Sequence, residues 1–292
     1  MDEVGIDLAM RIKTLAALLL LLFVTLTITG CANVKKTAAI NALVPTEGFM
    51  RQQVSYGRHP DQVLDLYLPK VDNPKIPIVY VYGSAWRKKF EKADFVFVAQ
   101  ALTSLGHPVI LPEHRRYPDV KFPVFIEDIA DAISYVERHN IGLAKPFNEF
   151  VLMGHSSGAH TAALLATDQR YFKQRRINAT LKGLIAMSGP YDLPMNDAEV
   201  APIFKTTAKQ AKPVLNVRRG MPPTLLLHGM ADTRVPAYHA ERFRDALRSN
   251  GNAVTTRLYR GVDHEKLIGG VAEPLRFLNN SFADIRAFLR RH

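Results

Sequence analysis

The residues of this chain best suited to chemistry form the stretch Gly154-His155-Ser156-Ser157-Gly158. An apolar run precedes it and a segment of small residues follows, so its context is strand, sharp turn and helix. A serine in this setting stands on a strained turn that exposes its hydroxyl, and the glycines leave room for the neighbouring strand and helix. We therefore predict that Ser156 is a nucleophile. The alternative is a Gly/Ser-rich turn without a catalytic role.

A serine hydroxyl is a weak nucleophile at neutral pH and needs a nearby base to take its proton. In chains with such a turn, the acid and then the histidine follow the serine. His264 stands in a turn between the last expected strand and the last expected helix. His228 ends a strand and His239 lies within an expected helix, which favour structural roles for both. The sequence therefore predicts His264 as the base.

The acid of such a site orients the base and stabilises its charged form. Asp232 lies on the loop after the penultimate expected strand, the position at which the acid of such a site is expected. Asp192, after the preceding strand, is the rival, and its alternative role is to cap a loop. Asp263 adjoins the base, where backbone geometry disfavours a contact with it. We predict Asp232 as the acid.

Acyl transfer also needs donors for the developing oxyanion, supplied by the loop after the first central strand and by the residue after the nucleophile. That loop reads Tyr82-Gly83-Ser84-Ala85-Trp86. The backbone amides of Ser84, Ala85 and Ser157 are the candidate donors. Trp86 is a candidate for lining the substrate pocket, and packing in the core is an equally good interpretation.

These motifs together resemble the α/β-hydrolase superfamily, and within it the bacterial carboxylesterases of the hormone-sensitive-lipase-like and feruloyl-esterase-like branch. The resemblance covers residues 50–292. It includes the loop at 82–86, the stretch Glu113-His114-Arg115-Arg116 in place of the usual Asp/Asn-Tyr-Arg-Leu, and the segments around Asp232 and His264. One departure stands out, because the branch usually has His-Gly-Gly-Gly-Trp where this chain has Tyr82, Ser84 and Ala85.

The resemblance implies a serine hydrolase that cleaves carboxylic esters of small molecules and uses no metal or organic cofactor. The same apparatus serves amide bonds, so an amide or formamide hydrolase of the arylformamidase type is the alternative. A non-catalytic lipoprotein on a retired hydrolase scaffold is the alternative from another class, favoured only by the altered oxyanion loop.

Strands and helices are expected to alternate along residues 50–292, which predicts an α/β fold with a mainly parallel central sheet and helices on both faces. Residues 51–56 and 62–68 are expected to pair as a hairpin around a turn at 57–60. Further expected strands lie at 76–82, 108–111, 150–153, 181–187, 224–228 and 254–259, and expected helices at 93–105, 122–139, 159–166, 237–248 and 274–289. Residues 189–222 lose this period and contain several prolines, so we expect a small lid there, with a surface helix and loops as the alternative.

The N-terminus differs from the rest of the chain. Residues 1–30 contain a basic stretch and a short apolar run typical of a secretory signal, with Met10 as an alternative start. They end in Ile28-Thr29-Gly30-Cys31, which resembles a bacterial lipobox, and Cys31 is the single cysteine of the 292 residues. The resemblance implies cleavage before Cys31 and its lipidation. Residues 31–49 are then expected to tether the protein to a membrane of the bacterial envelope, with the outer membrane weakly favoured.

Composition limits the other function classes. The chain is 47% hydrophobic and 22% charged, which is typical of a globular domain. Its formal net charge of +11 is compatible with an anionic lipid surface, although a solvated basic surface is the simpler interpretation. Since no helix-turn-helix, zinc or Arg-rich motif accompanies the charge, we expect no nucleic-acid partner.

Overall fold

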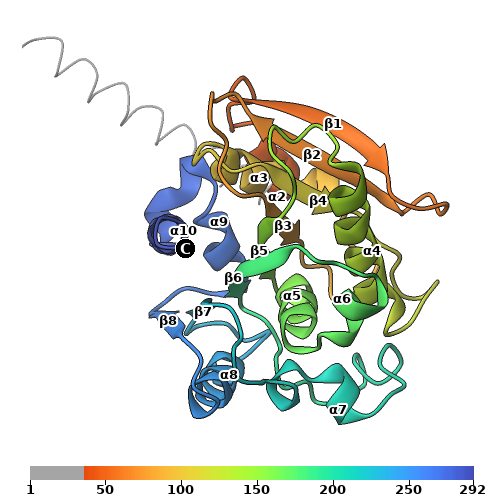
Figure 1. The fold of residues 1–292 in the computed structure, drawn as a ribbon. Helices are drawn as coiled ribbons and strands as arrows, with labels where there is room; N and C mark the ends of the chain where they lie inside the picture. The colour runs from red at the N-terminus through yellow and green to blue at the C-terminus, as the bar shows by residue number, and fades with distance from the viewer. Residues whose placement is uncertain (1–35) are drawn as a thin grey trace, which may run out of the picture. The chain divides into compact units, whose positions relative to one another are not determined.

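A computed structural model describes residues 36–292 of the chain. Within this range, eight strands form one sheet in the order β1-β2-β4-β3-β5-β6-β7-β8 (Figure 1). The first two pairings, β1 with β2 and β2 with β4, are antiparallel, and all pairings from β4 to β8 are parallel. The strands are β1 (Phe49–Ser55), β2 (Val63–Pro69), β3 (Ile78–Val81), β4 (Val109–Pro112), β5 (Glu149–His155), β6 (Thr180–Met187), β7 (Thr224–Gly229) and β8 (Val254–Tyr259).

Helices cover both faces of the sheet, as expected for the α/β-hydrolase fold. One face packs against α4 (Val124–His139), α5 (Ser157–Thr167) and α8 (Tyr238–Ser249). The other face packs against α3 (Val96–Thr103), α9 (His264–Gly269) and α10 (Ser281–Leu289). The remaining short elements are α2 (Lys36–Asn41), α6 (Arg170–Gln174), α7 (Ala208–Ala211), η1 (Lys92–Phe95), η2 (Pro213–Leu215) and η3 (Glu273–Leu278).

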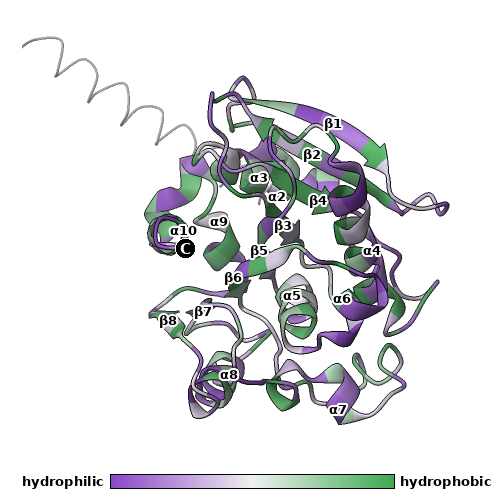
Figure 2. Cartoon of the chain, in the orientation of Figure 1, coloured by the Kyte–Doolittle hydropathy of each residue, from purple (hydrophilic) through white to green (hydrophobic). Residues whose placement is uncertain are grey.

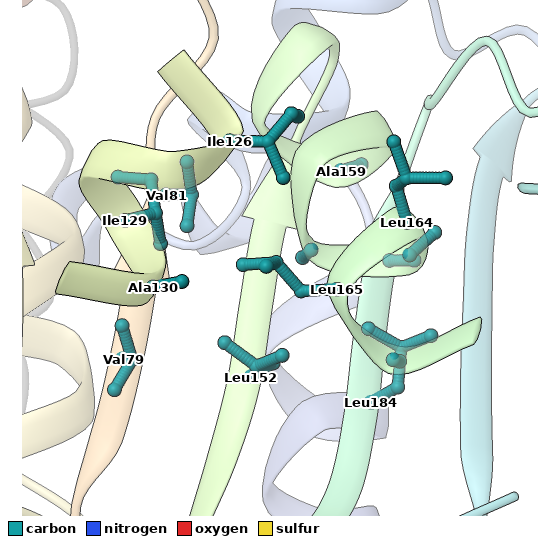
Figure 3. Packing of buried hydrophobic residues seen from close by; sticks show 14 of the residues in the cluster. Val79, Val81, Ile126, Ile129, Ala130, Leu152, Ala159, Leu164, Leu165 and Leu184 are labelled. Carbon is teal, nitrogen blue, oxygen red and sulfur yellow. The ribbon is translucent and has the colours of Figure 1, made fainter. Parts of the chain in front are cut away.

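Alternation along the buried strands builds a hydrophobic core on each face. On β3, Val79 and Val81 point toward α4 and α5, where they pack with Ile126 and Leu165 (Figure 3). Their neighbours on the strand, Ile78 and Tyr80, belong to the cluster on the opposite face. Because both faces of the central strands are buried, these strands are almost uniformly apolar.

The edge strand β1 differs from the central strands. Its residues are mostly exposed, and Figure 2 shows it as largely hydrophilic. Together with β2 it forms the expected hairpin, in register from Phe49 opposite Pro69 to Ser55 opposite Val63. A polar edge limits pairing with other chains.

The prediction of one continuous closing helix at 274–289 is wrong, because the structure divides this segment. The structure has a 3-10 segment, η3, then a break at Asn279 and Asn280, and then the shorter helix α10. The backbone of Asn279 is extended, and its side-chain oxygen accepts a hydrogen bond from the Ser281 amide at 2.8 Å. Asparagine competes in this way with the helical hydrogen bonds, so the helix starts again after the break.

Residues 189–222 connect β6 to β7 and contain the short elements α7 and η2. Val200, Ile203 and Phe204 are buried in the same cluster as α4 and α5, so the segment is packed onto this face of the domain. Its role as a lid stays a prediction. Within residues 36–292, no helix is long and apolar enough to cross a membrane. Cys31 and the expected signal segment lie outside the described residues.

Candidate active site

The turn that carries Ser156 joins β5 to α5, as the sequence predicts. Ser156 has φ 56° and ψ −126°, a strained conformation for a residue with a side chain. Its amide is held by the carbonyl of Met187 on the neighbouring strand at 2.9 Å. The side chain is partly exposed between buried neighbours. The turn therefore presents the hydroxyl at the carboxyl end of the central strand.

The turn requires glycine at positions 154 and 158, because neighbouring backbone leaves no room for a Cβ at either. A Cβ added at Gly158 would lie 2.0 Å from the carbonyl oxygen of Val81 on β3. One added at Gly154 would lie 2.3 Å from the carbonyl oxygen of Gly158. Both distances are far below van der Waals contact. The sequence signal that identified the turn is thus a direct consequence of how tightly β3, β5 and α5 approach one another.

His264 and Asp232 form the expected hydrogen bond between base and acid. The distance from His264 Nδ1 to Asp232 Oδ2 is 2.7 Å, and both side chains are almost fully buried. The other carboxylate oxygen of Asp232 accepts the amides of Arg234 at 3.0 Å and Val235 at 2.8 Å. Burial alone would raise the pKa of Asp232, but the hydrogen bonds from His264 and the backbone lower it below its usual value. The carboxylate therefore stays ionised opposite the imidazole.

The rival residues have other partners. The carboxylate of Asp192 binds Lys212 Nζ at 2.7 Å and also Arg242, so it ties the 189–222 segment to α8. Asp263 caps α9 by accepting the amides of Glu265 and Lys266. His228 donates from Nε2 to the carbonyl of Val235 at 2.7 Å.

His239 is the remaining histidine that the sequence offered as a base. Its Nδ1 accepts the amide of Asp192 at 3.2 Å. Burial lowers the pKa of His239 to about 4, so it stays neutral at physiological pH. Both histidines therefore have backbone partners, and neither makes the 2.7 Å contact with Asp232 that His264 makes.

The residue before the serine, His155, contacts His264. His155, which precedes Ser156, lies with its ring centroid 4.7 Å from that of His264. Its Nε2 donates a hydrogen bond of 3.2 Å to the backbone carbonyl of His264. Within residues 36–292, no hydrogen bond joins Ser156 Oγ to His264. The proton transfer between these two side chains therefore stays a prediction.

No signal in the sequence assigned this role to His155, because a contact between positions 155 and 264 is purely tertiary. Burial, together with the neighbouring His264, lowers the pKa of His155 well below its usual value. The ring is therefore neutral and keeps its Nε2 proton for the carbonyl.

The loop at 82–86 lies directly against the nucleophile turn. A Cβ added at Gly83 would lie 2.7 Å from both the carbonyl oxygen of His155 and the Cβ of Ser156. Ala85 and Trp86 have φ of 53° and 55°, the left-handed region that glycine adopts most easily. Here the His-Gly-Gly-Gly-Trp pattern of similar enzymes would place glycine at position 85, and this chain holds alanine instead.

Of the three amides predicted as oxyanion donors, one is engaged. The amide of Ser84 donates to Ser157 Oγ at 2.9 Å. In the described part of the chain, the amides of Ala85 and Ser157 have no such partner, and Ser157 N stands at the first position of α5, where helix amides are free. Their role as donors stays a prediction.

Trp86 is buried, with 6% of its surface exposed. Its ring packs edge-on against Phe204 at 4.8 Å and His160 at 5.2 Å. It thereby joins the oxyanion loop to the 189–222 segment and to α5. Its indole nitrogen has no partner among the described residues. The observed packing supports a structural role, and lining of the substrate pocket stays a prediction.

The BD-FAE family matches residues 64–247, more than half of the chain. This chain belongs to that family. The match includes Ser156 and Asp232 and ends before His264.

Curated relatives with sequence similarity are mostly named as esterases. The isoprenylcysteine alpha-carbonyl methylesterase ICME of Arabidopsis thaliana is 28% identical over 78% of this chain and 58% of its own length. The esterase LipC of Mycobacterium tuberculosis is 25% identical over 68% of this chain and 55% of its own. A kynurenine formamidase of Danio rerio is 29% identical over 48% of this chain and 46% of its own. The chain thus spans under three fifths of the length of these relatives.

Solved structures share the fold. A truncated carbohydrate esterase from gut microbiota superimposes with a TM-score of 0.74 at 22% identity, covering 85% of this chain and 98% of its own. Esterase B of Lactobacillus rhamnosis gives 0.72 at 18% identity, covering 100% of this chain and 97% of its own. The predicted α/β-hydrolase fold is therefore confirmed, and the predicted carboxylesterase class of enzyme agrees with the names of relatives and structural neighbours.

Proposed function

We propose that this protein is a serine hydrolase that cleaves carboxylic esters of small molecules through an acyl-enzyme intermediate. The observation that carries the proposal is the 2.7 Å hydrogen bond between His264 and Asp232, formed beside the strained turn of Ser156. A histidine held by a buried carboxylate and in contact with the residue before a partly exposed serine is an arrangement suited to nucleophilic acyl transfer.

In this mechanism Ser156 Oγ attacks the ester carbonyl while His264 Nε2 takes its proton. Asp232 keeps the imidazole proton on Nδ1 and stabilises the imidazolium that forms. Backbone amides around Ala85 and Ser157 donate to the oxyanion of the tetrahedral intermediate. His264 then protonates the leaving alcohol, and it later removes a proton from the water that releases the acyl group.

The test uses Ser156→Ala and a fluorophosphonate probe that labels activated serines. We expect wild-type protein to hydrolyse p-nitrophenyl butyrate and to be labelled, and both signals to be lost in Ser156→Ala. Ser134→Ala, which removes another buried hydroxyl, on α4 and bonded to the carbonyl of Arg175, serves as the control and keeps the labelling. Labelling that persists in Ser156→Ala would refute this nucleophile. An intact fold without any labelling would support the non-catalytic alternative.

Formamide hydrolysis is the second candidate function. It is favoured by the similarity to a protein named kynurenine formamidase, which covers about half of each chain. The same serine, histidine and acid would attack a formyl carbonyl and expel an amine. Rates on short-chain p-nitrophenyl esters and on N-formyl aryl amines, measured side by side, distinguish the two functions. If kcat/KM is higher for the formamide than for the ester, the substrate class is the formamide and not the ester.

We further propose that the chain is a bacterial lipoprotein anchored through Cys31, on the strength of the lipobox-like sequence that ends there. Its acyl chains would insert in a membrane of the cell envelope, with the outer membrane as the expected location. Expression in a bacterial host with an alkyne-tagged fatty acid tests this proposal. We expect labelling of the wild type in the membrane fraction and none of Cys31→Ser. Labelling of Cys31→Ser would contradict it.

A further inference from the structure

A buried cluster of three polar side chains lies behind the oxyanion loop. Tyr82 follows the end of β3, and Glu113 and Arg116 follow the end of β4, the neighbouring parallel strand. All three are almost fully buried, with 1%, 6% and 6% of their surfaces exposed. Charged groups at such depth are rare unless they are paired and hydrogen-bonded. The contacts within the cluster are therefore expected to hold the conformation of the loop that starts at Tyr82.

Each member of the cluster contacts the other two. The Tyr82 hydroxyl donates to Glu113 Oε1. Arg116 lies 3.1 Å from the same carboxylate oxygen and donates to the Tyr82 hydroxyl at 2.9 Å. Glu113 also accepts the backbone amides of Lys92 at 3.0 Å and His114 at 3.2 Å. Burial raises the pKa of Tyr82 well above its usual value, so the phenol keeps the proton that it donates.

The cluster also contacts the chain around and beyond the loop at 82–86. Arg116 donates from Nη1 to the carbonyl of Phe90, four residues after the end of this loop. The next residue, Tyr117, donates its amide to the carbonyl of Trp86 at 2.9 Å. The segment at 116–117 thus contacts the loop at its first residue, Tyr82, and its last, Trp86, and also contacts Phe90 beyond it.

The loop needs such support because Ala85 and Trp86 between these anchor points have positive φ. A non-glycine residue in this region is strained and persists only where the surroundings enforce it.

Two residues of the cluster, Tyr82 and Arg116, differ from those expected in the carboxylesterase branch that this chain resembles. Position 82 usually holds histidine and position 116 leucine in the carboxylesterase branch that this chain resembles, whereas here tyrosine and arginine hydrogen-bond to each other. The alanine at 85 in place of glycine is a third departure, at the strained part of the loop.

We infer that Tyr82, Glu113 and Arg116 are positioning residues that set the geometry of the oxyanion donors. The inference rests on the proposed function and extends it to residues that do not touch the substrate. Removing one contact in the cluster is expected to loosen the donor amides without changing how the substrate is bound. The transition state then loses stabilisation that the ground state never had, so kcat falls and KM does not.

The chain offers a matched pair of variants for the test. Tyr82→Phe removes the hydroxyl that Glu113 and Arg116 share. Tyr80→Phe removes the hydroxyl of the other tyrosine on the same face of β3, which is buried, packs against the same Phe95 and has no hydrogen-bond partner among the described residues. The full chain is assayed for kcat and KM with p-nitrophenyl butyrate. Inhibition by an aryl trifluoromethyl ketone, whose adduct with serine carries an oxyanion, is measured in parallel.

We expect Tyr82→Phe to lower kcat about tenfold, to change KM less than about twofold and to weaken the ketone by the same factor as kcat/KM. Tyr80→Phe is expected to match the wild type in all three measurements. Tyr82→His, which retains a donor for Glu113, is expected to recover part of the loss. Arg116→Lys, which keeps the charge but cannot reach Glu113, Tyr82 and Phe90 together, is expected to reproduce it.

Equal kinetics of Tyr82→Phe and Tyr80→Phe would overturn the inference while leaving the proposed function intact. A loss confined to KM, with the affinity for the ketone unchanged, would overturn it as well. If Tyr82→Phe fails to fold, Arg116→Lys decides by the same criteria. Wild-type protein that neither hydrolyses esters nor binds the ketone would refute the proposed function itself, and the inference with it.

Discussion

Replacing Asp232 with asparagine tests the central contact of the site at almost constant volume. One oxygen of the carboxylate accepts the amides of Arg234 and Val235, and the other faces His264 Nδ1 at 2.7 Å. The two backbone donors fix the orientation of an asparagine here, because its amide oxygen must take the place where they point. Its NH2 group is then left facing the imidazole.

This orientation forces the wrong tautomer on the base. The NH2 group needs an acceptor, so His264 Nδ1 gives up its proton and the neutral imidazole carries one on Nε2 instead. An Nε2 that already bears a proton cannot take the proton of Ser156. In serine hydrolases built on this geometry the same change lowers kcat about 10,000-fold, which is about 5.5 kcal/mol of transition-state stabilisation.

The assay is ester hydrolysis at neutral pH, with Asp192→Asn as the matched control. Asp192 is engaged with Lys212 and Arg242, so this second variant is expected to keep kcat within about threefold of the wild type. Thermal unfolding verifies that both variants are folded. The reasoning is refuted if Asp232→Asn retains more than about a tenth of the wild-type kcat, or if Asp192→Asn is the variant that loses activity.

Two further predictions concern stability. Gly158→Ala places a methyl group where a Cβ lies 2.0 Å from the Val81 carbonyl oxygen, and it should lower the free energy of unfolding by more than about 3 kcal/mol in urea titrations. Gly48→Ala, where a Cβ has nothing within 4 Å, should change it by less than about 1 kcal/mol, and similar losses in the two variants would contradict this account of the turn. Burial lowers the pKa of His160 to about 4, so the unfolded chain binds a proton near pH 6.5 that the folded chain takes up only near pH 4. Stability should therefore fall as the pH drops from 6.5 toward 4, with His160 contributing up to about 1.4 kcal/mol per pH unit. The slope between pH 6.5 and 4.5 should be shallower in His160→Gln, and equal slopes would show that this histidine is not responsible.

Much of the fold was predictable because the strands and long helices carry local patterns. The apolar run before Ser156 and the 3.6-residue period of α4 fix those elements without any knowledge of their neighbours. Chain order together with strand ends selected Asp232 over Asp192, and the structure shows Asp232 on His264. A local sequence pattern was sufficient to predict an element wherever the residues of that element alone determine its conformation.

The remaining features depend on contacts between distant positions. The break at Asn279 goes with a side chain that accepts the Ser281 amide, and the helical periodicity of the sequence does not reveal it. The engagement of the Ser84 amide by Ser157 Oγ joins residues 73 positions apart. The cluster of Tyr82, Glu113 and Arg116 is likewise invisible until β3 and β4 are known to be neighbours.

The hydrogen bond from His155 to the carbonyl of His264 has a consequence for motion in the site. The bond joins the backbone of His264, the first residue of α9, to the side chain of His155, which precedes Ser156. Since this bond joins the two segments directly, we expect thermal motion to change the separation of residues 155 and 264 less than it changes the position of either. The predicted pair of Ser156 and His264 would then keep its relative geometry while the surrounding domain moves.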